Sequence, residues 1–475
     1  MTEPANSAIG QKGAISRGSA TRASRTAVTV MALASLGGIL YGYDIGIISG
    51  ALLFMNTDLA LTPSDASLIV AAVLGGGALA TLFSGPFADR YGRRFSLNLS
   101  AVIFIIGVVA VVFSHSFTAV MVGRIVQGVG IGIITIVVPL YLVETMPPSL
   151  RGRGVTLFQL CLTFGILLGY VIGYALNGSG DWQMMFATML VPAVAFLAAG
   201  LFVLPRSPRW LYRQGRIDEA RTVLARIQGE AGTEQALAEI AAARKEEQRR
   251  GRGDWGLLLQ PGFRKAFLIA LAVGILNQLT GINTLLQFNT VILQESGLHS
   301  SAGAILGSVG VGLANFIITI VALTLIDKVG RRPLLILGTA GTCVALVFIG
   351  VVHLLAPPSL FVGYATLAGF ITFVIFYAIG PGVVVWLAIS EVLPLAIRAK
   401  GMAVALFANS LVSAGLAALF MTVVETIGYG GTFLILGFFV LLYLLVAVFP
   451  LPETRGRSLE DIEKAFFAGI KRPQD

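Results

Sequence analysis

The chain has 475 residues, of which 56% are hydrophobic and only 12% charged, and its formal net charge is +9. With a mean hydropathy of +0.86, this composition excludes an ordinary soluble domain, in which about a quarter of the residues are charged. Many apolar runs reach about 20 residues, the length of a membrane-crossing helix, so we expect an all-α polytopic membrane protein. The positive charge then marks one membrane face, and no nucleic-acid partner is expected.

The first predicted element is a basic cytosolic tail over residues 1–26, which lacks the apolar core and cleavage site of a signal peptide. Six predicted spans follow, over residues 27–55, 66–87, 96–115, 119–143, 153–176 and 184–204. Six more cover residues 266–293, 302–326, 333–355, 360–390, 399–424 and 430–450. Lys and Arg are absent from the turns after odd-numbered spans and frequent after spans 2, 4, 6, 8 and 10. The positive-inside rule therefore predicts two cytoplasmic termini in the cell inner (plasma) membrane.

One long connection, residues 205–264, separates the two sets of spans. Residues 217–228 and 234–247 carry Ala, Leu and Ile at helical spacing, which predicts short amphipathic helices on the cytosolic surface. A solvated linker with marginal helices is the alternative. The expected domains are the tail (1–26), an N-terminal six-helix bundle (27–204), the linker (205–264), a C-terminal six-helix bundle (265–451) and a cytosolic C-terminal tail (452–475).

Charged motifs recur at equivalent places in the two sets of spans. DRYGRR at 89–94 returns 238 residues later as DKVGRR at 327–332, and ETMPPSLRGRG at 144–154 returns 247 residues later as EVLPLAIRAKG at 391–401. PRSPRWL at 205–211 after span 6 is matched by PLPETRG at 450–456 after span 12. Because charge is costly inside a bilayer, such turns mark the same aqueous edge twice. The pattern indicates a duplicated bundle, as in transporters.

These motifs, with GRIVQGVG (123–130), NQLTGIN (277–283), GPG before Trp386 and PETRGRS (452–458), resemble the signature set of the sugar porters of the major facilitator superfamily. The resemblance extends from about Leu36 to Ile462. It implies 12 transmembrane helices in two bundles related by a pseudo-twofold axis, around one central site reached alternately from each side. The sequence has no P-loop, HExxH or GxSxG motif and no Cys/His ligand spacing, so neither an enzyme nor a metal site is predicted.

The repeated charged residues are predicted to meet at the cytosolic ends of their bundles as a gate. It would be closed when the site faces outward and open when the site faces inward. Since a single exposed ion pair contributes about 0 to 1 kcal/mol, only a network could bias two global states. Topology signalling and helix capping alone are the alternative. The residues are Asp89, Arg93, Arg94, Glu144, Arg151, Asp327, Arg331, Arg332, Glu391 and Arg398.

A neutral sugar offers hydrogen bonds and apolar ring faces, so its site is expected to combine amides with an aromatic ring. The family pattern implies as substrate-binding residues Gln159, Asn277, Gln278, Asn283, Gln287, Asn315, Trp386 and Asn409. A locally unwound segment at Gly281 would bring the amides at 277, 278 and 283 together. Each amide taken singly could instead bond to a neighbouring helix. Asn277, Gln287 and Ser410 depart from the family pattern, which leaves a hexose, a pentose or a cyclic polyol such as inositol as the cargo.

Asp44 in span 1 is the predicted proton-coupling residue. A charged carboxylate at a helix centre costs about 2.5 to 3.5 kcal/mol on insertion scales, so we expect it to face the bundle interior with Arg124 of span 4 as partner. Movement of Arg124 would switch Asp44 between proton release and proton capture. An acid at this position resembles the proton symporters of the family. The alternative is a permanent structural ion pair.

The predicted function is secondary active transport of a monosaccharide or cyclic polyol, coupled to proton import, by alternating access. The proton is the coupling ion and no other cofactor is expected. A passive sugar facilitator and a transporter-like sugar sensor are the alternatives. The expected partners are the sugar or polyol, the proton and the lipid bilayer, and each chain is expected to function as a monomer with a complete pathway.

Overall fold

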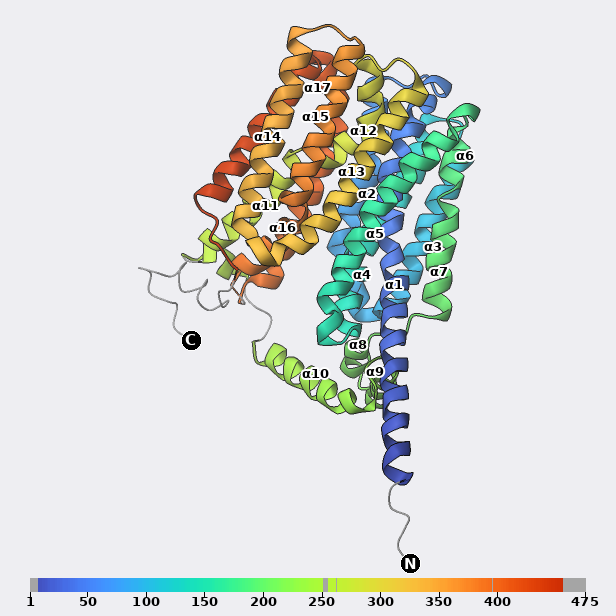
Figure 1. Cartoon of the computed structure of the whole chain (residues 1–475), viewed down its shortest axis with the longest axis vertical. Coiled ribbons are helices and arrows are strands. Elements are labelled where there is room, and N and C mark those ends of the chain that lie inside the picture. Colours follow the sequence, from blue (N-terminus) through green and yellow to red (C-terminus); the bar gives the residue numbers. More distant parts are fainter. Residues whose placement is uncertain (1–6, 251–254, 262, 395, 456–475) are drawn as a thin grey trace, which may run out of the picture.

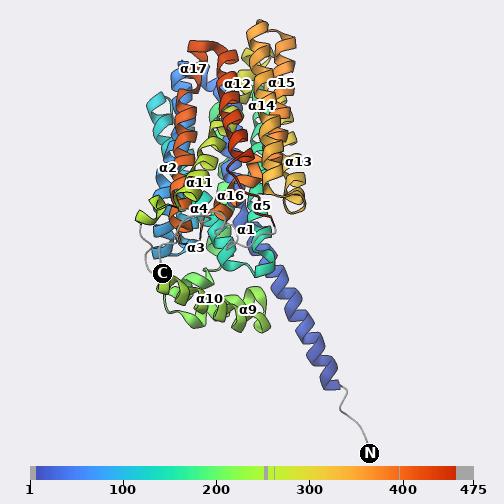
Figure 2. The same cartoon turned by 90° about the vertical axis from the view of Figure 1, so that its left-hand side faces the viewer.

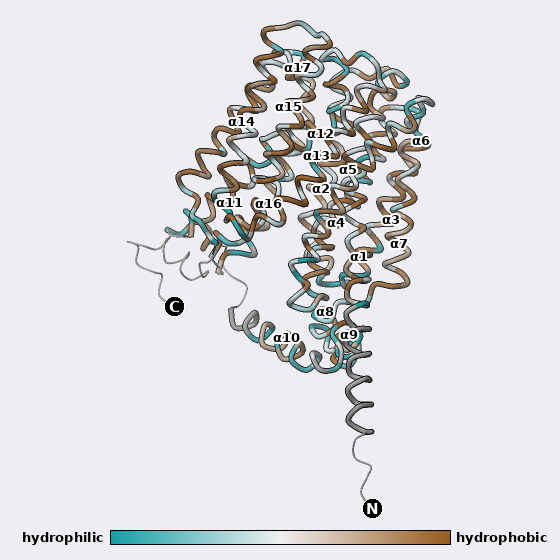
Figure 3. The backbone as a smooth tube through the Cα atoms, in the orientation of Figure 1, coloured by the Kyte–Doolittle hydropathy of each residue, from teal (hydrophilic) through white to brown (hydrophobic). Residues whose placement is uncertain are grey.

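The computed structural model describes residues 7–250, 255–261, 263–394 and 396–455; the side chains of residues 7–24, 231, 246–250, 327 and 399 are outside this description. Within these ranges every regular element is a helix. The long helices of the two halves run side by side along the long axis, whereas the helix over residues 230–250 lies across it at one end (Figures 1 and 2). Hydrophobic residues dominate the long helices, whereas hydrophilic residues gather around the short helices at one end (Figure 3). The predicted all-α architecture is confirmed.

The N-terminal half contains α1 to α7, and capping residues define several of its helix starts. Thr62 and Asp65 form a reciprocal capping box at the start of α2, and the Ser116 side chain caps α4. The bounds are α1 (Ser7–Asp58), α2 (Pro63–Tyr91), α3 (Arg93–Val112), α4 (Phe117–Thr145), α5 (Pro148–Ala175), α6 (Trp182–Ala187) and α7 (Leu190–Phe202), with a short 3₁₀ turn, η1 (Asn177–Ser179), before α6.

The linker forms α8 (Pro208–Arg213), α9 (Ile217–Gln228) and α10 (Glu230–Arg250), followed by the 3₁₀ turn η2 (Trp255–Leu259). Helices are therefore present at both predicted places. The buried apolar residues of α9, Ala220 and Leu224, pack with Leu237 and Ile240 of α10 in a small separate core. We call the end of the molecule that carries α8 to α10 the linker end, and the opposite end, which holds α6, the far end (Figure 1).

The C-terminal half contains two helix pairs that are broken at glycine. Gly281 separates α11 from α12 with a left-handed φ of 82°, and Gly380 separates α15 from α16. The break that the sequence predicts at Gly281 is thus confirmed. The bounds are α11 (Phe263–Leu279), α12 (Ile282–Glu295), α13 (Ser301–Val329), α14 (Arg331–Leu355), α15 (Leu360–Ile379), α16 (Pro381–Val392) and α17 (Arg398–Val448).

Helix α17 accounts for the last two predicted spans. A straight helix of its 51 residues would be about 75 Å long, far more than the roughly 30 Å of a bilayer core. Gly428 has non-helical angles (φ 74°, ψ 169°), and the chain turns back there. At the start of α14, Arg332 bonds to the carbonyl oxygens of Ala447 and Val448 at the end of α17. Its neighbour Arg331 pairs with Glu391, which lies shortly before the first residue of α17. Both ends of α17 therefore lie near the start of α14. The eleven apolar membrane-length segments found in the described residues therefore make twelve crossings.

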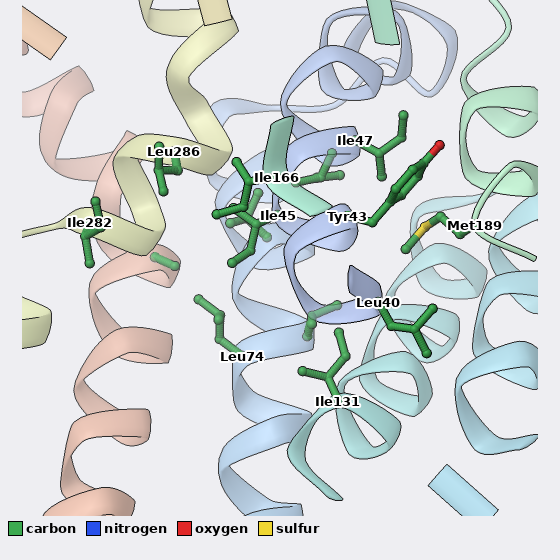
Figure 4. Packing of buried hydrophobic residues seen from close by; sticks show 14 of the residues in the cluster. Leu40, Tyr43, Ile45, Ile47, Leu74, Ile131, Ile166, Met189, Ile282 and Leu286 are labelled. Carbon is green, nitrogen blue, oxygen red and sulfur yellow. The ribbon is translucent and has the colours of Figure 1, made fainter. Parts of the chain in front are cut away.

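Glycines allow α1 to lie against α5 at backbone distance. A Cβ built on Gly42 would stand 1.8 Å from the carbonyl oxygen of Leu162, and one on Gly46 would stand 2.3 Å from that of Ile166. Small residues at four-residue spacing are the usual way for membrane helices to approach closely. The continuous apolar core around α1 also includes residues of the other half, such as Ile282 and Leu286 on α12 (Figure 4). This packing fixes α1 at the centre of the molecule.

Candidate functional site

A cavity lies between the two halves, with a different chemistry on each wall. The N-terminal half contributes a mostly apolar wall from α1, α2 and α4, with polar atoms from Tyr41, Thr81 and Thr135. The C-terminal half contributes only polar side chains from α11, α12 and α17, namely Gln278, Asn283, Asn409, Ser410 and Ser413. A pocket with one apolar and one hydrogen-bonding wall suits a molecule that has both ring faces and hydroxyl groups.

The polar wall is a connected chain of amides. Gln278 Nε2 donates to Asn409 Oδ1 at 3.2 Å, and Asn283 Nδ2 donates both to Gln278 Oε1 and to Ser413 Oγ, each at 3.1 Å. Asn409 in turn donates to the Gly274 carbonyl oxygen at 2.8 Å. The break at Gly281 makes this chain possible, because it rotates Asn283 toward Gln278. Three of the eight predicted substrate residues thus line one cavity.

The other five predicted substrate residues are not among the residues that line this cavity. Asn277 is buried and accepts a hydrogen bond from the Tyr377 hydroxyl at 3.4 Å. Gln287 is fully buried and donates to the Asn283 carbonyl oxygen, while its Oε1 has no partner among the described residues. Asn315 on α13 is also buried, Gln159 on α5 is partly buried, and the Trp386 side chain on α16 is 40% exposed.

Asp44 and Arg124 form a fully buried ion pair. Arg124 Nη1 lies 2.5 Å from Asp44 Oδ1, and the two side chains are 0% and 1% exposed. Arg124 also donates to Gln127 Oε1 at 3.2 Å and to the Ile69 carbonyl oxygen at 3.5 Å, and its guanidinium lies over the Phe186 ring. Breaking such a buried pair by removing one partner is costly, since it leaves an uncompensated charge. The geometry therefore links α1, α4 and α2 through one guanidinium.

Sequence reasoning missed several residues of this region. Tyr41 lines the cavity one turn before Asp44, Gln127 supports Arg124 from one turn along α4, and Ser413 lies one turn after Asn409. A search for polar residues three or four positions from each candidate, which share its helix face, would have found all three. Thr81 and Thr135 lacked such a signal, because neither lies three or four positions from a predicted site residue. Both hydroxyls donate to carbonyl oxygens of their own helices.

At the far end, hydrogen bonds join the two halves. The hydroxyls of Ser49 on α1 and Thr290 on α12 lie 2.8 Å apart, and the Tyr170 hydroxyl on α5 donates to the Leu286 carbonyl oxygen at 2.6 Å. Residues Thr284 to Leu293 of α12 are all buried. The cavity is therefore closed toward the far end.

At the linker end of the N-terminal half, the predicted gate residues form an ion-pair cluster. Arg93 Nη2 lies 2.6 Å from Asp89 Oδ1 and 2.7 Å from Glu144 Oε1, and the Ser207 hydroxyl donates to Glu144 Oε2 at 2.6 Å. Arg94 bonds to the carbonyl oxygens of Gly200 and Leu201 at the end of α7. Arg151 lies 4.0 Å from Glu239 of the linker.

The C-terminal half repeats this cluster. Arg331 lies 3.4 Å from Glu391, and the Thr454 hydroxyl donates to the other oxygen of Glu391 at 2.5 Å. Arg332 bonds to the end of α17, Arg398 donates to the Leu393 carbonyl oxygen, and the side chain of Asp327 is outside the described residues. Among the described side chains, the ion pairs of both clusters stay within one half or reach the linker. The two clusters therefore have equivalent structures in the two halves and, within the described part of the chain, do not form one network that joins the halves.

Comparison with known proteins shows the same fold and a transporter family. The family model described as "Sugar (and other) transporter" matches residues 30–466. The major myo-inositol transporter IolT of Bacillus subtilis is 36% identical over 450 residues, which cover 93% of this chain and 94% of IolT.

Among solved structures, the inward open conformation of the xylose transporter XylE from E. coli matches with a TM-score of 0.79 at 28% identity, covering 92% of this chain and 99% of that one. The proton:xylose symporter XylE bound to 6-bromo-6-deoxy-D-glucose matches with a TM-score of 0.76 at 29% identity, covering 93% and 99% of the two chains.

Proposed function

The chain belongs to the sugar transporter family of the major facilitator superfamily, and we propose that it imports a monosaccharide or cyclic polyol together with a proton. As a member of this family it is a multi-pass membrane transporter of sugars or polyols and not an enzyme. The observation that carries the finer proposal is the adjacency of the cavity and the buried pair. Tyr41 lines the cavity, and Asp44 follows one turn later on the same helix.

Proton coupling follows from the surroundings of that pair. A protonated Asp44 has no charge to pair with Arg124, whose other hydrogen-bond partners are Gln127 on α4 and the Ile69 carbonyl oxygen on α2. Helix α2 also contacts the C-terminal half, because its Ser67 hydroxyl accepts a hydrogen bond from the Met421 N–H of α17 at 3.0 Å. Gain or loss of one proton at Asp44 would therefore change how Arg124 joins α1 to α2, and α2 is a helix that contacts both halves. The XylE relative described as a proton:xylose symporter supports this assignment.

The orientation follows from the charges. The linker end carries the arginine clusters, and the positive-inside rule places such an end in the cytoplasm. Both termini would then be cytoplasmic, and the far end would face outward. With the far end closed by Ser49 and Thr290, the cavity in this conformation would communicate with the cytoplasm. The ion-pair clusters, which among the described side chains do not join the two halves, would act as the gate in its open state.

Substrate recognition is assigned to the amide chain of the C-terminal half. Each hydroxyl of a sugar or polyol can donate one hydrogen bond and accept two, and the Gln278, Asn283 and Asn409 amides offer both kinds of partner. Asn277, Gln287, Asn315, Gln159 and Trp386 would join them only through side-chain or helix movement. The names of the relatives, a myo-inositol transporter and a xylose transporter, support a monosaccharide or a cyclic polyol as the cargo.

Purified protein in proteoliposomes tests this function. Counterflow of radiolabelled myo-inositol, xylose, glucose, galactose and fructose would identify the cargo, and counterflow of none of them would contradict the transport proposal. An inward proton gradient is then imposed with equal cargo on both sides. A symporter accumulates the cargo, by up to about tenfold per pH unit for one proton, whereas a passive facilitator leaves both sides equal.

A further inference from the structure

A second cavity lies away from the transport site, at the linker end of the N-terminal half. It encloses about 390 Å³ and is lined by Tyr91, Gly92, Arg93, Arg94, Phe95, Asn98, Arg206, Ser207, Trp210 and Arg216. Four of these residues are arginines and none is acidic. The first residues of α3 also line it, so the positive end of a 20-residue helix opens into the cavity.

The equivalent helix start in the C-terminal half, that of α14, is capped by a carboxylate. Gly330 (φ 109°, ψ 164°) precedes α14, and the carboxylate of Glu453 accepts the backbone N–H groups of Arg331 at 3.2 Å and of Arg332 at 3.1 Å. Gly92 precedes α3 in nearly the same conformation (φ 93°, ψ 150°), yet no side chain among the described residues accepts the N–H groups at the start of α3. Within the part of the chain that the structure describes, the carboxylate is therefore present at the start of α14 and missing from the start of α3.

The residue that replaces this carboxylate can be identified from the structure. Ser207 and Thr454 are equivalent, because their hydroxyls donate to Glu144 and Glu391 in the twin clusters. The residues just before them are Arg206 and Glu453, so an arginine stands where the other half has the capping acid. The acidic side chain that neutralises the start of α14 thus corresponds to a basic side chain beside the start of α3.

Nearby carboxylates compensate these arginines only in part. Glu219 alone pairs with both Arg206 and Arg216, all three being well exposed. Arg93 pairs with Asp89 and Glu144, and only its Nε lacks a hydrogen-bond partner among the described residues. Arg94 bonds to carbonyl oxygens rather than to an acid. The cavity therefore combines unfilled backbone donors with excess positive charge, which is the chemistry of a phosphate site.

We propose that this cavity binds a phosphate group, held by the start of α3 and by Arg206 and Arg216 in the place that the Glu453 carboxylate takes in the other half. The phosphate would come from an anionic phospholipid headgroup or from the cytosol. The exposed rings of Tyr91 and Phe95 at the rim resemble the aromatic residues found at membrane surfaces. This site does not depend on the transport proposal, since binding can be measured without transport.

The test compares the thermal stability of the delipidated full-length protein with two probes. Inorganic phosphate is titrated at constant ionic strength against chloride, and nanodiscs of phosphatidylcholine are compared with nanodiscs that contain one part phosphatidylglycerol in five. We expect a saturable rise of Tm with phosphate, a higher Tm in the anionic nanodiscs, or both. A response to phosphate alone identifies a soluble ligand, and a response to the anionic lipid alone identifies a headgroup.

Arg206→Glu is the decisive variant, because it supplies the acid that Glu453 provides in the twin site. It should raise Tm without added anion and lose the response to the probes. Arg226→Glu, an equal charge change at an exposed position of α9 outside the cavity, should keep the response. Arg206→Gln, which removes the charge without adding a carboxylate, should weaken binding about tenfold or more. The proposal is overturned if wild type responds to neither probe, or if both Arg206 variants respond as wild type does.

Discussion

Tyr41 and Asp44 lie one turn apart on α1, with Tyr41 on the wall of the central cavity and Asp44 bound to Arg124. Residues three apart on a helix share a face, so a molecule in the cavity contacts the helical turn next to the buried acid. Closure of α1 around a cargo would move the acid relative to Arg124 on α4. We propose this adjacency as the structural basis for coupling a neutral cargo to a proton.

Asp44→Asn should separate transport from coupling. Asparagine keeps the size of the side chain and a hydrogen bond to Arg124 but cannot exchange a proton, so cargo counterflow should persist while accumulation under a proton gradient falls to a ratio of one. Proteoliposome uptake with and without the gradient measures both. Asp58→Asn is the matched control, because Asp58 accepts a hydrogen bond from Trp182 that asparagine can also accept. Uphill uptake by Asp44→Asn would refute the coupling role.

Arg124→Met should destabilise the protein in a pH-dependent way. The substitution leaves Asp44 buried without its partner, which typically costs about 3 to 5 kcal/mol when the acid is charged. A protonated Asp44 carries no charge, so the drop in Tm should be smaller at pH 5 than at pH 8. Adding Asp44→Asn to Arg124→Met should recover most of the loss at pH 8. Equal losses at both pH values, without recovery in the double variant, would mean that the charge is not the cause.

Truncation of the amide chain should weaken cargo binding. Gln278→Ala removes the donor to Asn409 and the acceptor for Asn283, and the loss of a buried hydrogen bond of about 1 to 3 kcal/mol corresponds to roughly 5- to 150-fold weaker affinity. Cargo affinity from concentration-dependent counterflow measures this. Gln294→Ala, which alters a glutamine at the end of α12 outside the cavity, should leave the affinity within about twofold. Equal affinities for Gln278→Ala and wild type would place the site elsewhere.

A substitution at Gly42 should test the packing that holds Asp44 in place. Gly42→Ala adds a Cβ that overlaps the Leu162 carbonyl oxygen, so α1 and α5 must separate, at a cost of about 1 to 3 kcal/mol for overpacking. Gly75→Ala is the control, since a Cβ there meets nothing within 4 Å, and alanine is the better helix former. We expect a lower Tm for the first variant and an unchanged or higher Tm for the second. The opposite order would show that the α1 and α5 contact is loose.

The sequence was sufficient for the helices, the duplication and the break at Gly281, because each has a local cause: apolar length, repeated charged turns, or a glycine that tolerates positive φ. It was also sufficient to pair Asp44 with Arg124, since few charged residues occur inside the spans. The direction in which each amide points was not predictable. Gln278 faces the cavity and its neighbour Asn277 faces Tyr377, a difference set by the packing of α11 against its neighbours.

The sequence comparison of PRSPRWL (205–211) with PLPETRG (450–456) placed Arg206 opposite Leu451, whereas the structure places it opposite Glu453. Only the hydrogen bonds of Ser207 and Thr454 to twin glutamates fix the alignment of the two segments. Likewise, nothing in the sequence shows that Trp386 is 40% exposed. Features that depend on how distant helices meet need the folded structure.

The amide chain belongs to the C-terminal half, whereas the Asp44 and Arg124 pair belongs to the N-terminal half. In the proposed function, the choice of cargo and the source of energy are therefore encoded in separate stretches of the polypeptide. Mutations that retune the amides for another polyol need not disturb the acid, and loss of the acid need not change which cargo fits. Related proteins could therefore change their cargo specificity while they keep the same mechanism of energy coupling.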